Sequence, residues 1–139
     1  MSLQQTLQVF ELIDNAYVKG QDVVDLFAHY PSVKASTHRV SGEKGTTDFV
    51  RIEIPGSEGK QSGGDAPTLG IIGRLGGIGA RPTRIGLVSD GDGAIAAIAS
   101  ALKLAEMQRK GDVLPGDVVI TTHICPNAPT RPHDPVDFM

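Results

Sequence analysis

The first thirty residues carry apolar side chains at intervals of three and four, the spacing of an amphipathic helix. The first such stretch covers residues 3 to 18, and its apolar positions are Leu3, Leu7, Phe10, Ile13 and Tyr17. A second, shorter stretch runs from about Asp22 to Tyr30 and is followed by Pro31, which cannot continue a helix. The pattern therefore predicts a helical amino-terminal region over residues 1 to 30.

Alternation of apolar and polar residues replaces this spacing in the next part of the chain. Residues 33 to 40 and 46 to 54 are separated by the short polar sequence Ser-Gly-Glu-Lys-Gly. In the second stretch Val50, Ile52 and Ile54 alternate with Arg51 and Glu53. A period of two predicts a pair of strands joined as a hairpin, with one face buried and one in water.

Two segments have the composition of irregular structure. Residues 55 to 67 consist mostly of Gly, Ser, Pro and charged residues with nothing to bury, so we expect a flexible surface loop. Residues 125 to 139 contain four of the nine prolines and show no period, which predicts an extended Pro-rich tail.

Short continuous apolar runs mark the second half of the chain, at residues 69 to 73, 85 to 88 and 118 to 120. Such runs are typical of strands that are buried on both faces. Residues 94 to 109 between the last two runs are rich in Ala, Leu and Lys and predict a helix. Strand, helix and strand with short links favour a right-handed crossover between parallel strands. We therefore expect one α/β domain over residues 1–139, built as a three-layer sandwich with a mixed, partly parallel sheet.

Polar residues follow three of these predicted strands. Arg74 follows the first, Asp90 the second and His123 the third. Ligands of parallel α/β sheets bind outside the carboxyl ends of the strands, so these side chains should gather around one crevice. Asp90 and His123 are the candidate catalytic residues.

Glycines surround two further candidates for ligand binding. The turn Asp90-Gly91-Asp92-Gly93 opens the predicted helix, so that Gly91 and Asp92 could contact a ligand, although Asp92 equally fits a helix N-cap. The turn also matches the G-x-G-x-x-A pattern of dinucleotide-binding folds, but two aspartates beside a pyrophosphate disfavour that interpretation. Residues 75 to 80 could present backbone N–H groups, and Arg81 a positive charge, to an anion, or could form a simple turn.

Side chains that can bind a metal cluster near the carboxyl terminus. His123 and Cys125 form a His-x-Cys pair, and His133 follows eight residues later. Imidazole and thiolate are zinc ligands, so these three residues and Asp90 are candidate ligands of zinc or another divalent metal. The spacing matches no familiar structural zinc site, and a free cysteine is often only a small buried apolar residue.

Composition narrows the classes of partner. A formal net charge of -3 without a polybasic block disfavours nucleic acids and anionic membranes. No apolar run approaches the roughly 20 residues of a membrane span, and the single cysteine suits a reducing compartment. We expect a cytoplasmic protein with a small-molecule or peptide-like ligand.

The order of these segments resembles the front half of the two-zinc aminopeptidase and carboxypeptidase clan. The resemblance covers most of residues 5 to 127 and rests on the stretches 49–56, 69–74, 89–94 and 114–121. It implies a truncated zinc-exopeptidase-like core. In addition, residues 123–139 look like the signature of an uncharacterised bacterial family, a domain of unknown function. Members of that family are about twice this length, which implies that the chain is an amino-terminal portion.

The metal ligands of the clan carry over only in part. Asp90 falls at the position of the aspartate that bridges the two zinc ions. Arg74 and Gly76 stand where the clan has His and Asp, while Ile124 and Cys125 or their neighbours stand where it has a pair of glutamates. A guanidinium group cannot ligate zinc, and without the glutamates no general base is visible.

Three functions remain open from the sequence. The first is a metal-dependent hydrolase of amide or peptide-like bonds with an atypical or degenerate metal site. The second is a non-catalytic module that binds small anions through Arg74, Arg81 and the glycine-rich turn. The third is a structural domain that forms a homo-oligomer by covering an unpaired sheet edge.

Overall fold

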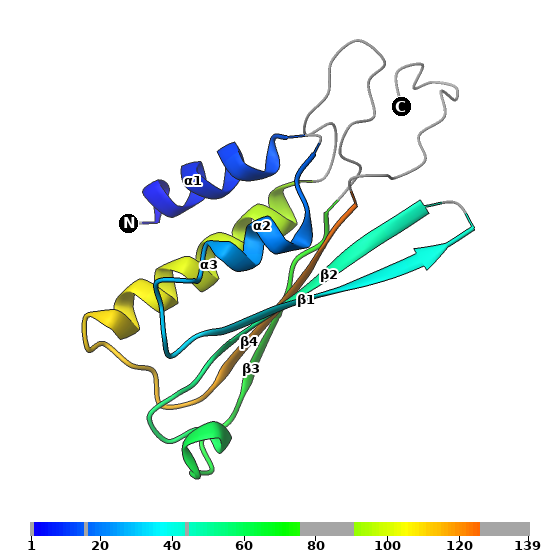
Figure 1. Cartoon of the computed structure of the whole chain (residues 1–139). Helices are drawn as coiled ribbons and strands as arrows, with labels where there is room; N and C mark the ends of the chain where they lie inside the picture. Colours follow the sequence, from blue (N-terminus) through cyan, green and yellow to red (C-terminus); the bar gives the residue numbers. More distant parts are fainter. Residues whose placement is uncertain (1, 16, 44, 76–90, 126–139) are drawn as a thin grey trace.

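The structure is a computed structural model that describes residues 2–15, 17–43, 45–75 and 91–125. Two helices and a pair of strands come first along the chain, and further helices and strands follow (Figure 1). Their order is α1 (Leu3–Ile13), α2 (Gly20–Asp25), β1 (Lys34–Gly42), β2 (Gly45–Ile54), the 3-10 helix η1 (Lys60–Ser62), β3 (Leu69–Ile72), α3 (Asp92–Arg109) and β4 (Val118–Ile124). The strand expected at residues 85 to 88 and the tail from residue 126 onward lie outside the described residues.

The four strands form one mixed sheet in the order β1-β2-β4-β3. β1 and β2 form the predicted antiparallel hairpin, with Gly42 opposite Gly45. β4 runs antiparallel to β2 and parallel to β3. A mixed sheet with helices confirms the expected α/β class, and the parallel pair brings the carboxyl ends of β3 and β4 to the same edge.

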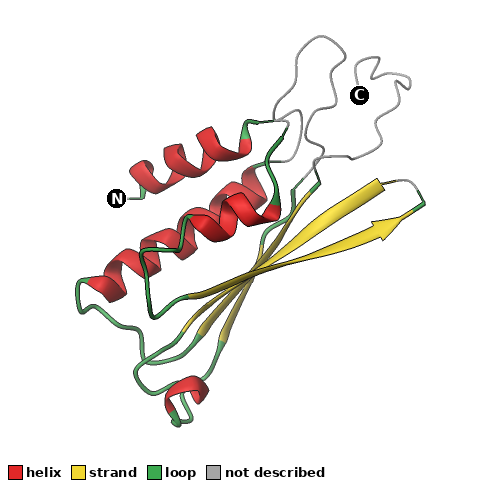
Figure 2. Cartoon of the chain, viewed as in Figure 1, coloured by secondary structure: helices red, strands yellow, loops and turns green. Residues whose placement is uncertain are grey.

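The helices cover one face of this sheet (Figure 2). Every second residue of β2 and β4 is buried beneath them, namely Val50, Ile52, Ile54, Val118, Ile120 and Ile124. The residues in between, such as Phe49 and its cross-strand partner His123, point to the other face. No helix of the described ranges covers that second face, so the third layer of the expected sandwich is not among these residues.

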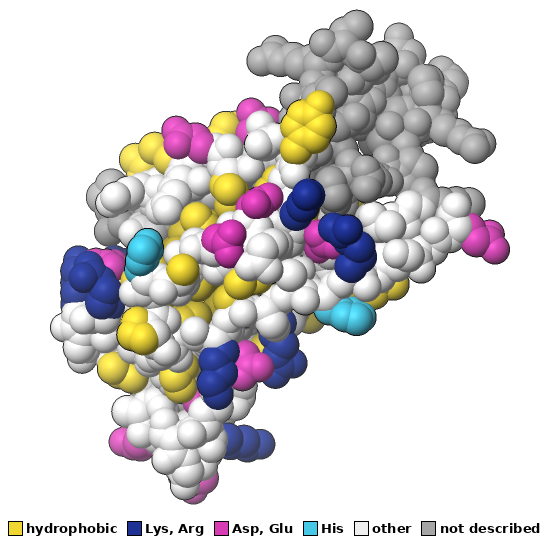
Figure 3. All heavy atoms as spheres, viewed as in Figure 1, with side chains coloured by type: hydrophobic (Ala, Val, Ile, Leu, Met, Phe, Trp, Pro, Cys, Tyr) yellow, Lys and Arg dark blue, Asp and Glu magenta, His cyan; other side chains and the backbone are white. Residues whose placement is uncertain are grey.

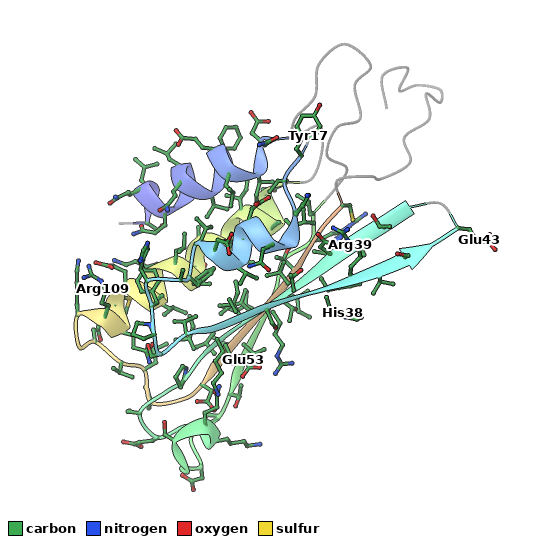
Figure 4. All side chains as sticks on the ribbon, viewed as in Figure 1. Tyr17, His38, Arg39, Glu43, Glu53 and Arg109 are labelled. Atoms are coloured by element: carbon green, nitrogen blue, oxygen red, sulfur yellow. The ribbon has the colours of Figure 1, made fainter. Side chains whose placement is uncertain are left out.

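Helix α1 is shorter than predicted and buries only Ile13 of the predicted apolar face, together with Val9. It ends at Ile13 rather than residue 18, and Tyr17 beyond its end is 80% exposed (Figure 4). Its contacts are made mainly with α3, through the fully buried Val9 and Ile13. Leu3, Leu7 and Phe10 of the expected apolar stripe stay largely exposed, and hydrophobic side chains are visible over this layer in Figure 3. Helix α1 carries two apolar stripes, and packing against α3 selects the one with Val9.

Helix α2 is held to the hairpin by a buried carboxylate. Asp48 of β2 accepts a hydrogen bond from the backbone N–H of Gly20 at 2.9 Å and forms an ion pair with Arg39 of β1 at 2.6 Å. The Arg39 side chain holds the pKa of Asp48 below its usual value, and the Gly20 amide acts in the same direction. A Cβ atom at Gly20 would collide with Thr37, so only glycine allows this close approach.

Helix α3 starts against the end of β3. The N-cap of α3 is Gly91, and Asp92 is its first helical residue. No side chain caps this end of the helix, so the N-cap interpretation of Asp92 was wrong. A Cβ atom on Gly93 would lie 2.7 Å from the carbonyl oxygen of Arg74, and one on Gly73 would meet the backbone of Gly93. Paired glycines therefore bring the first turn of α3 beside Arg74. None of the described helices combines the length and apolarity needed to cross a membrane.

The segment 55–67 has more local order than its composition suggests. It contains η1, and an isolated bridge joins Gly59 to Ala66. The carboxylate of Asp117, just before β4, accepts hydrogen bonds from the backbone N–H groups of Gly56 and Gln61. A side chain more than fifty residues away therefore supplies the anchor that the local sequence lacks.

Candidate functional site

The carboxyl ends of β3 and β4 bring Arg74 and His123 together. The chain leaves β3 through Gly73 and Arg74 to the buried Leu75, while His123 is the penultimate residue of β4. The backbone N–H of Leu75 donates a hydrogen bond to Nε2 of His123 at 3.4 Å. This bond crosses from one strand end to the other, and it fixes the imidazole ring at the edge where parallel sheets bind ligands.

Three polar side chains meet on the face of the sheet opposite the helices. We call Thr47, His123 and Cys125 the thiol cluster. The Sγ atom of Cys125 lies 3.0 Å from Nδ1 of His123 and 2.7 Å from Oγ1 of Thr47. The Thr47 hydroxyl also lies 3.2 Å from Nδ1 and donates to the carbonyl of Ile124 at 3.2 Å. β2 and β4 position the cluster because they pair antiparallel, which puts the beginning of β2 beside the end of β4.

The Leu75 amide determines the tautomer of His123. A donor at Nε2 requires a lone pair there, so the neutral ring carries its proton on Nδ1. Nδ1–H then faces the sulfur of Cys125 and the oxygen of Thr47. In this arrangement the imidazole is a hydrogen-bond donor to the thiol cluster.

The surroundings of His123 keep the ring neutral. Burial lowers its pKa from the usual 6.5, and the positive charge of Arg74 lowers it further. The Phe49 ring, with its centroid 6.1 Å away, covers part of the imidazole on the open sheet face. The site therefore combines an uncharged imidazole with a nearby guanidinium cation.

The thiol cluster does not fit a divalent metal. Nε2 of His123 already accepts a hydrogen bond. Nδ1 of His123 and Sγ of Cys125 are hydrogen-bonded to each other, and Sγ is also within hydrogen-bond distance of the Thr47 hydroxyl. Arg74 adds a positive charge that opposes a second cation. Among the described residues, no three His, Cys, Asp or Glu side chains form a group that could hold a metal ion.

The other predicted site residues divide into two sets. Gly91 and Asp92 begin α3, whose first turn lies against the backbone of Arg74, so these candidate ligand-binding residues belong to the same end of the sheet. Asp90, Arg81 and His133 lie outside the described residues, and their roles stay predictions.

Thr47 and the Leu75 amide were not predicted from the sequence. Thr47 lies 78 positions from Cys125 along the chain, and only the β2 to β4 register brings them together. The alternation in residues 46 to 54, extended back along the strand, would have placed Thr47 on the same face as Phe49. The position of the Leu75 backbone has no signal in the sequence.

The comparisons with known proteins place the chain in a family. Residues 38–139 match the family described as "Protein of unknown function (DUF1177)". The chain belongs to this family. The domain of unknown function expected from the carboxyl-terminal signature is thus confirmed. Among the curated proteins, none matches this DUF1177 chain.

Two solved structures resemble the DUF1177 chain. The bottromycin maturation enzyme BotP, solved in complex with Mn, superimposes with a TM-score of 0.62 at 16% identity, over 93% of this chain and 31% of BotP. A glutaminyl cyclase from an Acidobacteriales bacterium gives a TM-score of 0.48 at 10% identity, over 99% of this chain and 47% of the cyclase. The chain thus spans about a third of the length of BotP. The likeness to BotP shows a shared α/β fold over this part of BotP.

Proposed function

We propose that the DUF1177 chain contributes to a hydrolase of amide or peptide-like bonds, and that Arg74 binds a carboxylate of the substrate. One observation carries the proposal. Arg74 and His123 meet at the carboxyl ends of two parallel strands, in an α/β fold of the kind that BotP also has. The expected substrate is a small peptide-like molecule that bears a carboxylate.

The charge distribution supports this ligand class. Arg74 is exposed, and within residues 2–15, 17–43, 45–75 and 91–125 no carboxylate forms an ion pair with it. A guanidinium group binds a carboxylate through two parallel hydrogen bonds, which fixes the orientation of the ligand as well as its position. His123 beside it is neutral and keeps its proton on Nδ1, so it adds no charge that would compete for the carboxylate.

A divalent metal enters the proposal only through the predicted ligand Asp90. BotP was solved with Mn, and zinc or manganese is the corresponding expectation here. Because the thiol cluster does not fit a metal, we derive no reaction step that uses one. The catalytic role of Asp90 stays a prediction.

Hydrolysis of matched substrates tests the assignment of Arg74. We expect turnover of dipeptides with a free α-carboxylate to exceed that of the same dipeptides with an amidated terminus. Arg74→Gln should raise KM for the free acid by roughly 10-fold to 100-fold, the cost of a lost hydrogen-bonded charge pair, and should remove the preference. Arg51→Gln is the matched control, because Arg51 lies on the same sheet face as His123 but pairs with Glu53.

Two results would contradict the proposal. Absence of turnover across the panel, with and without added Zn²⁺ or Mn²⁺, would remove the hydrolase. An Arg74→Gln variant that kept the wild-type preference would remove the carboxylate site.

A second candidate function, a non-catalytic anion-binding module, is favoured by the same exposed Arg74. In that case dicarboxylates or sulfate would raise the Tm of the wild type and not of Arg74→Gln, and no substrate would be turned over. The expected homo-oligomer also stays a prediction, which light scattering of the purified chain checks directly.

A further inference from the structure

We propose that the groove between α2 and β1 binds an extended peptide segment of another protein. The peptide joins the sheet as an added strand next to β1 and places one apolar side chain in the groove, with a basic side chain beside it. The proposal is independent of the hydrolase. It rests on the cavity between α2 and β1, on the unpaired edge of β1, and on the charge of Asp25.

The groove is a cavity of about 240 Å³ that is lined only by residues from positions 24 to 35. The buried ring of Phe27 and the half-buried Tyr30, Val33 and Ala35 supply its apolar walls. The ring centroids of Phe27 and Tyr30 lie 6.4 Å apart. Pockets that enclose drug-sized ligands measure roughly 300–1,000 Å³, so this smaller groove suits a single apolar side chain.

The turns between α2 and β1 hold these walls in place. The backbone N–H of Tyr30 donates to the carbonyl of Phe27 at 3.0 Å, and that of Val33 donates to the carbonyl of Tyr30 at 2.9 Å. The hydroxyl of Ser32 donates to Oε1 of Gln108 on α3 at 2.8 Å. A groove whose walls are already fixed costs less ordering when a ligand binds.

The outer edge of β1 offers backbone groups to an added strand. Among the described strands, only β2 pairs with β1. Two residues separate Gly42 from its partner Gly45, and such a pair is hydrogen-bonded, so every second residue before Gly42 bonds to β2. Ala35 and Thr37 fall between these positions and direct their N–H and C=O groups away from β2. An extended peptide can bond to such groups and extend the sheet.

The same two residues bring an added strand over the groove. Ala35 lies opposite the buried Ile52, and Thr37 lies next to Gly20 of α2, so both side chains are on the helix-covered face. A peptide residue opposite Ala35 directs its side chain to that face as well, because neighbouring strands share the pleat. One register therefore supplies both the backbone hydrogen bonds and the side chain for the groove.

Asp25 gives the groove a preference for positive charge. It is the only charged residue of the lining, it is exposed, and no described cation forms an ion pair with it. Gln21 donates one hydrogen bond to its carboxylate, at 2.7 Å. Side chains two positions apart on a strand share a face, so a Lys or Arg two residues from the apolar side chain can reach Asp25. Lys34 does not line the groove, because side chains alternate along β1.

A second copy of this chain fits the groove less well than a peptide. If the β1 strands of two copies paired, the side chains offered to the groove would be Ala35, Thr37 and Arg39. The first two are too small to fill the cavity, and Arg39 is already paired with Asp48. The geometry therefore favours a partner with a larger apolar residue at this position.

The groove lies at the end of the sheet away from the candidate site. Ala35 pairs with Ile52, and Ile52 pairs with Ile120 near the beginning of β4 (Figure 1). His123 lies at the other end of β4. Peptide binding and hydrolysis therefore depend on different residues.

Fluorescence anisotropy of the full chain with labelled synthetic peptides tests the groove. The probe is Thr-X-Thr-Lys-Thr with X as Phe, Leu or Met, blocked at both ends. We expect these peptides to bind roughly 10-fold to 100-fold more tightly than the same peptide with Ser at X, the value of burying one apolar side chain. Replacing Lys by Glu in the peptide should weaken binding roughly two-fold to five-fold, the value of an exposed ion pair.

Backbone methylation of the probe distinguishes strand addition from side-chain binding alone. One isomer carries N-methyl groups on X and Lys, and the other carries them on the Thr residues before and after X. In an added strand only alternate amides face β1, so one isomer should lose binding and the other should keep it. Equal affinity of the two isomers would overturn the proposal.

Variants of the chain test each part of the groove. Ala28→Phe fills the cavity from its exposed rim and should abolish binding. Asp25→Lys should reverse the preference between the Lys and Glu peptides, whereas Glu11→Lys, on α1, should leave it unchanged. Ala35→Pro removes an outward N–H and should abolish binding. Ser41→Pro is its matched control, because Ser41 is an outward position of β1 outside the groove.

Three results would overturn the proposal besides equal affinity of the methylated isomers. The first is the absence of binding by all three peptides up to about 1 mM. The second is wild-type affinity in Ala28→Phe, a test that does not depend on whether Ala35→Pro folds. The third is a dimer that Ala35→Pro abolishes and Ser41→Pro keeps, which would assign the edge of β1 to a second copy. Loss of hydrolysis alone leaves these affinities unchanged, so the two proposals fail separately.

Discussion

The carboxylate of Asp117 accepts a hydrogen bond from the backbone N–H of Gly56, and the two residues are 61 positions apart. Asp117 also accepts from the amide of Gln61, so it ties the segment after β2 to the beginning of β4. The Gly56 hydrogen bond is the main reason why the pKa of Asp117 lies below its usual value.

Acid should therefore weaken the fold through Asp117. A carboxylate with a lowered folded-state pKa contributes its full stability above the ordinary value near 3.8 and loses it as the pH falls through the folded pKa. We expect Asp117→Asn to lower the free energy of unfolding at pH 7. The difference from the wild type should shrink below pH 4, where the wild-type carboxylate becomes protonated.

Urea unfolding between pH 3 and pH 7 measures this dependence. Asp112→Asn is a suitable control, because Asp112 is exposed in the turn after α3. Equal pH slopes for wild type and Asp117→Asn would show that Asp117 does not couple folding to protonation.

The same residue explains the limits of the sequence analysis. Alternation in β2 and the Ala-rich composition of α3 predicted these elements, because local patterns reflect a single buried face. Order in the segment 55–67 depends on Asp117, which the local composition does not reveal. In α1 two apolar stripes compete, and only the position of α3 decides between them.

The sequence predicted the part of the candidate site that lies at the carboxyl ends of strands. Arg74 and His123 were found because parallel strands end at one edge. Thr47 reaches Cys125 only through the antiparallel register of β2 and β4, and the tautomer of His123 depends on a backbone amide. Contacts between segments this far apart in the sequence can be identified only from the tertiary structure.

The glycines where α3 meets β3 make a second prediction. A Cβ atom on Gly93 would lie 2.7 Å from the Arg74 carbonyl oxygen, whereas one on Gly70 of β3 would meet no atom within 4 Å. Gly93→Ala should lower the free energy of unfolding by about 1–3 kcal/mol, although alanine favours helices, because the first turn of α3 must move away from the strand end. Gly70→Ala should be close to neutral.

Chemical denaturation measures the free energy of unfolding of Gly93→Ala and Gly70→Ala. If Gly93→Ala proves as stable as Gly70→Ala, α3 does not pack against Arg74 as closely as the structure describes. A shift in the His123 resonances of Gly93→Ala would further show that this contact positions the site.

The titration of His123 gives a third prediction. Burial and Arg74 both lower its pKa, so its NMR titration midpoint should fall below 6.5. Arg74→Gln should raise the midpoint without restoring 6.5, because burial is the larger cause. Since the folded pKa is lowered, the stabilising contribution is complete above pH 6.5 and is lost as the pH falls through the folded value.

Two controls make the titration specific. Arg51→Gln, on the same sheet face, should leave the midpoint of His123 unchanged. A wild-type midpoint at or above 6.5 would mean that the ring is neither buried nor close to the Arg74 cation.

Metal content is the last prediction, and it addresses Asp90. The clan resemblance places Asp90 at the bridging ligand of two zinc ions, while the thiol cluster does not fit a metal. If Asp90 holds a divalent ion, protein purified without chelator should contain zinc or manganese, and Asp90→Asn should lose it without unfolding.

Asp92→Asn is the matched control, because Asp92 is exposed in the first turn of α3. Cys125→Ser should keep the metal, since its sulfur is engaged with His123 and Thr47. Elemental analysis of the four proteins distinguishes the cases: equal, near-zero content in wild type and Asp90→Asn removes the metal from the proposed hydrolase, and loss in Cys125→Ser contradicts the separation of the two sites.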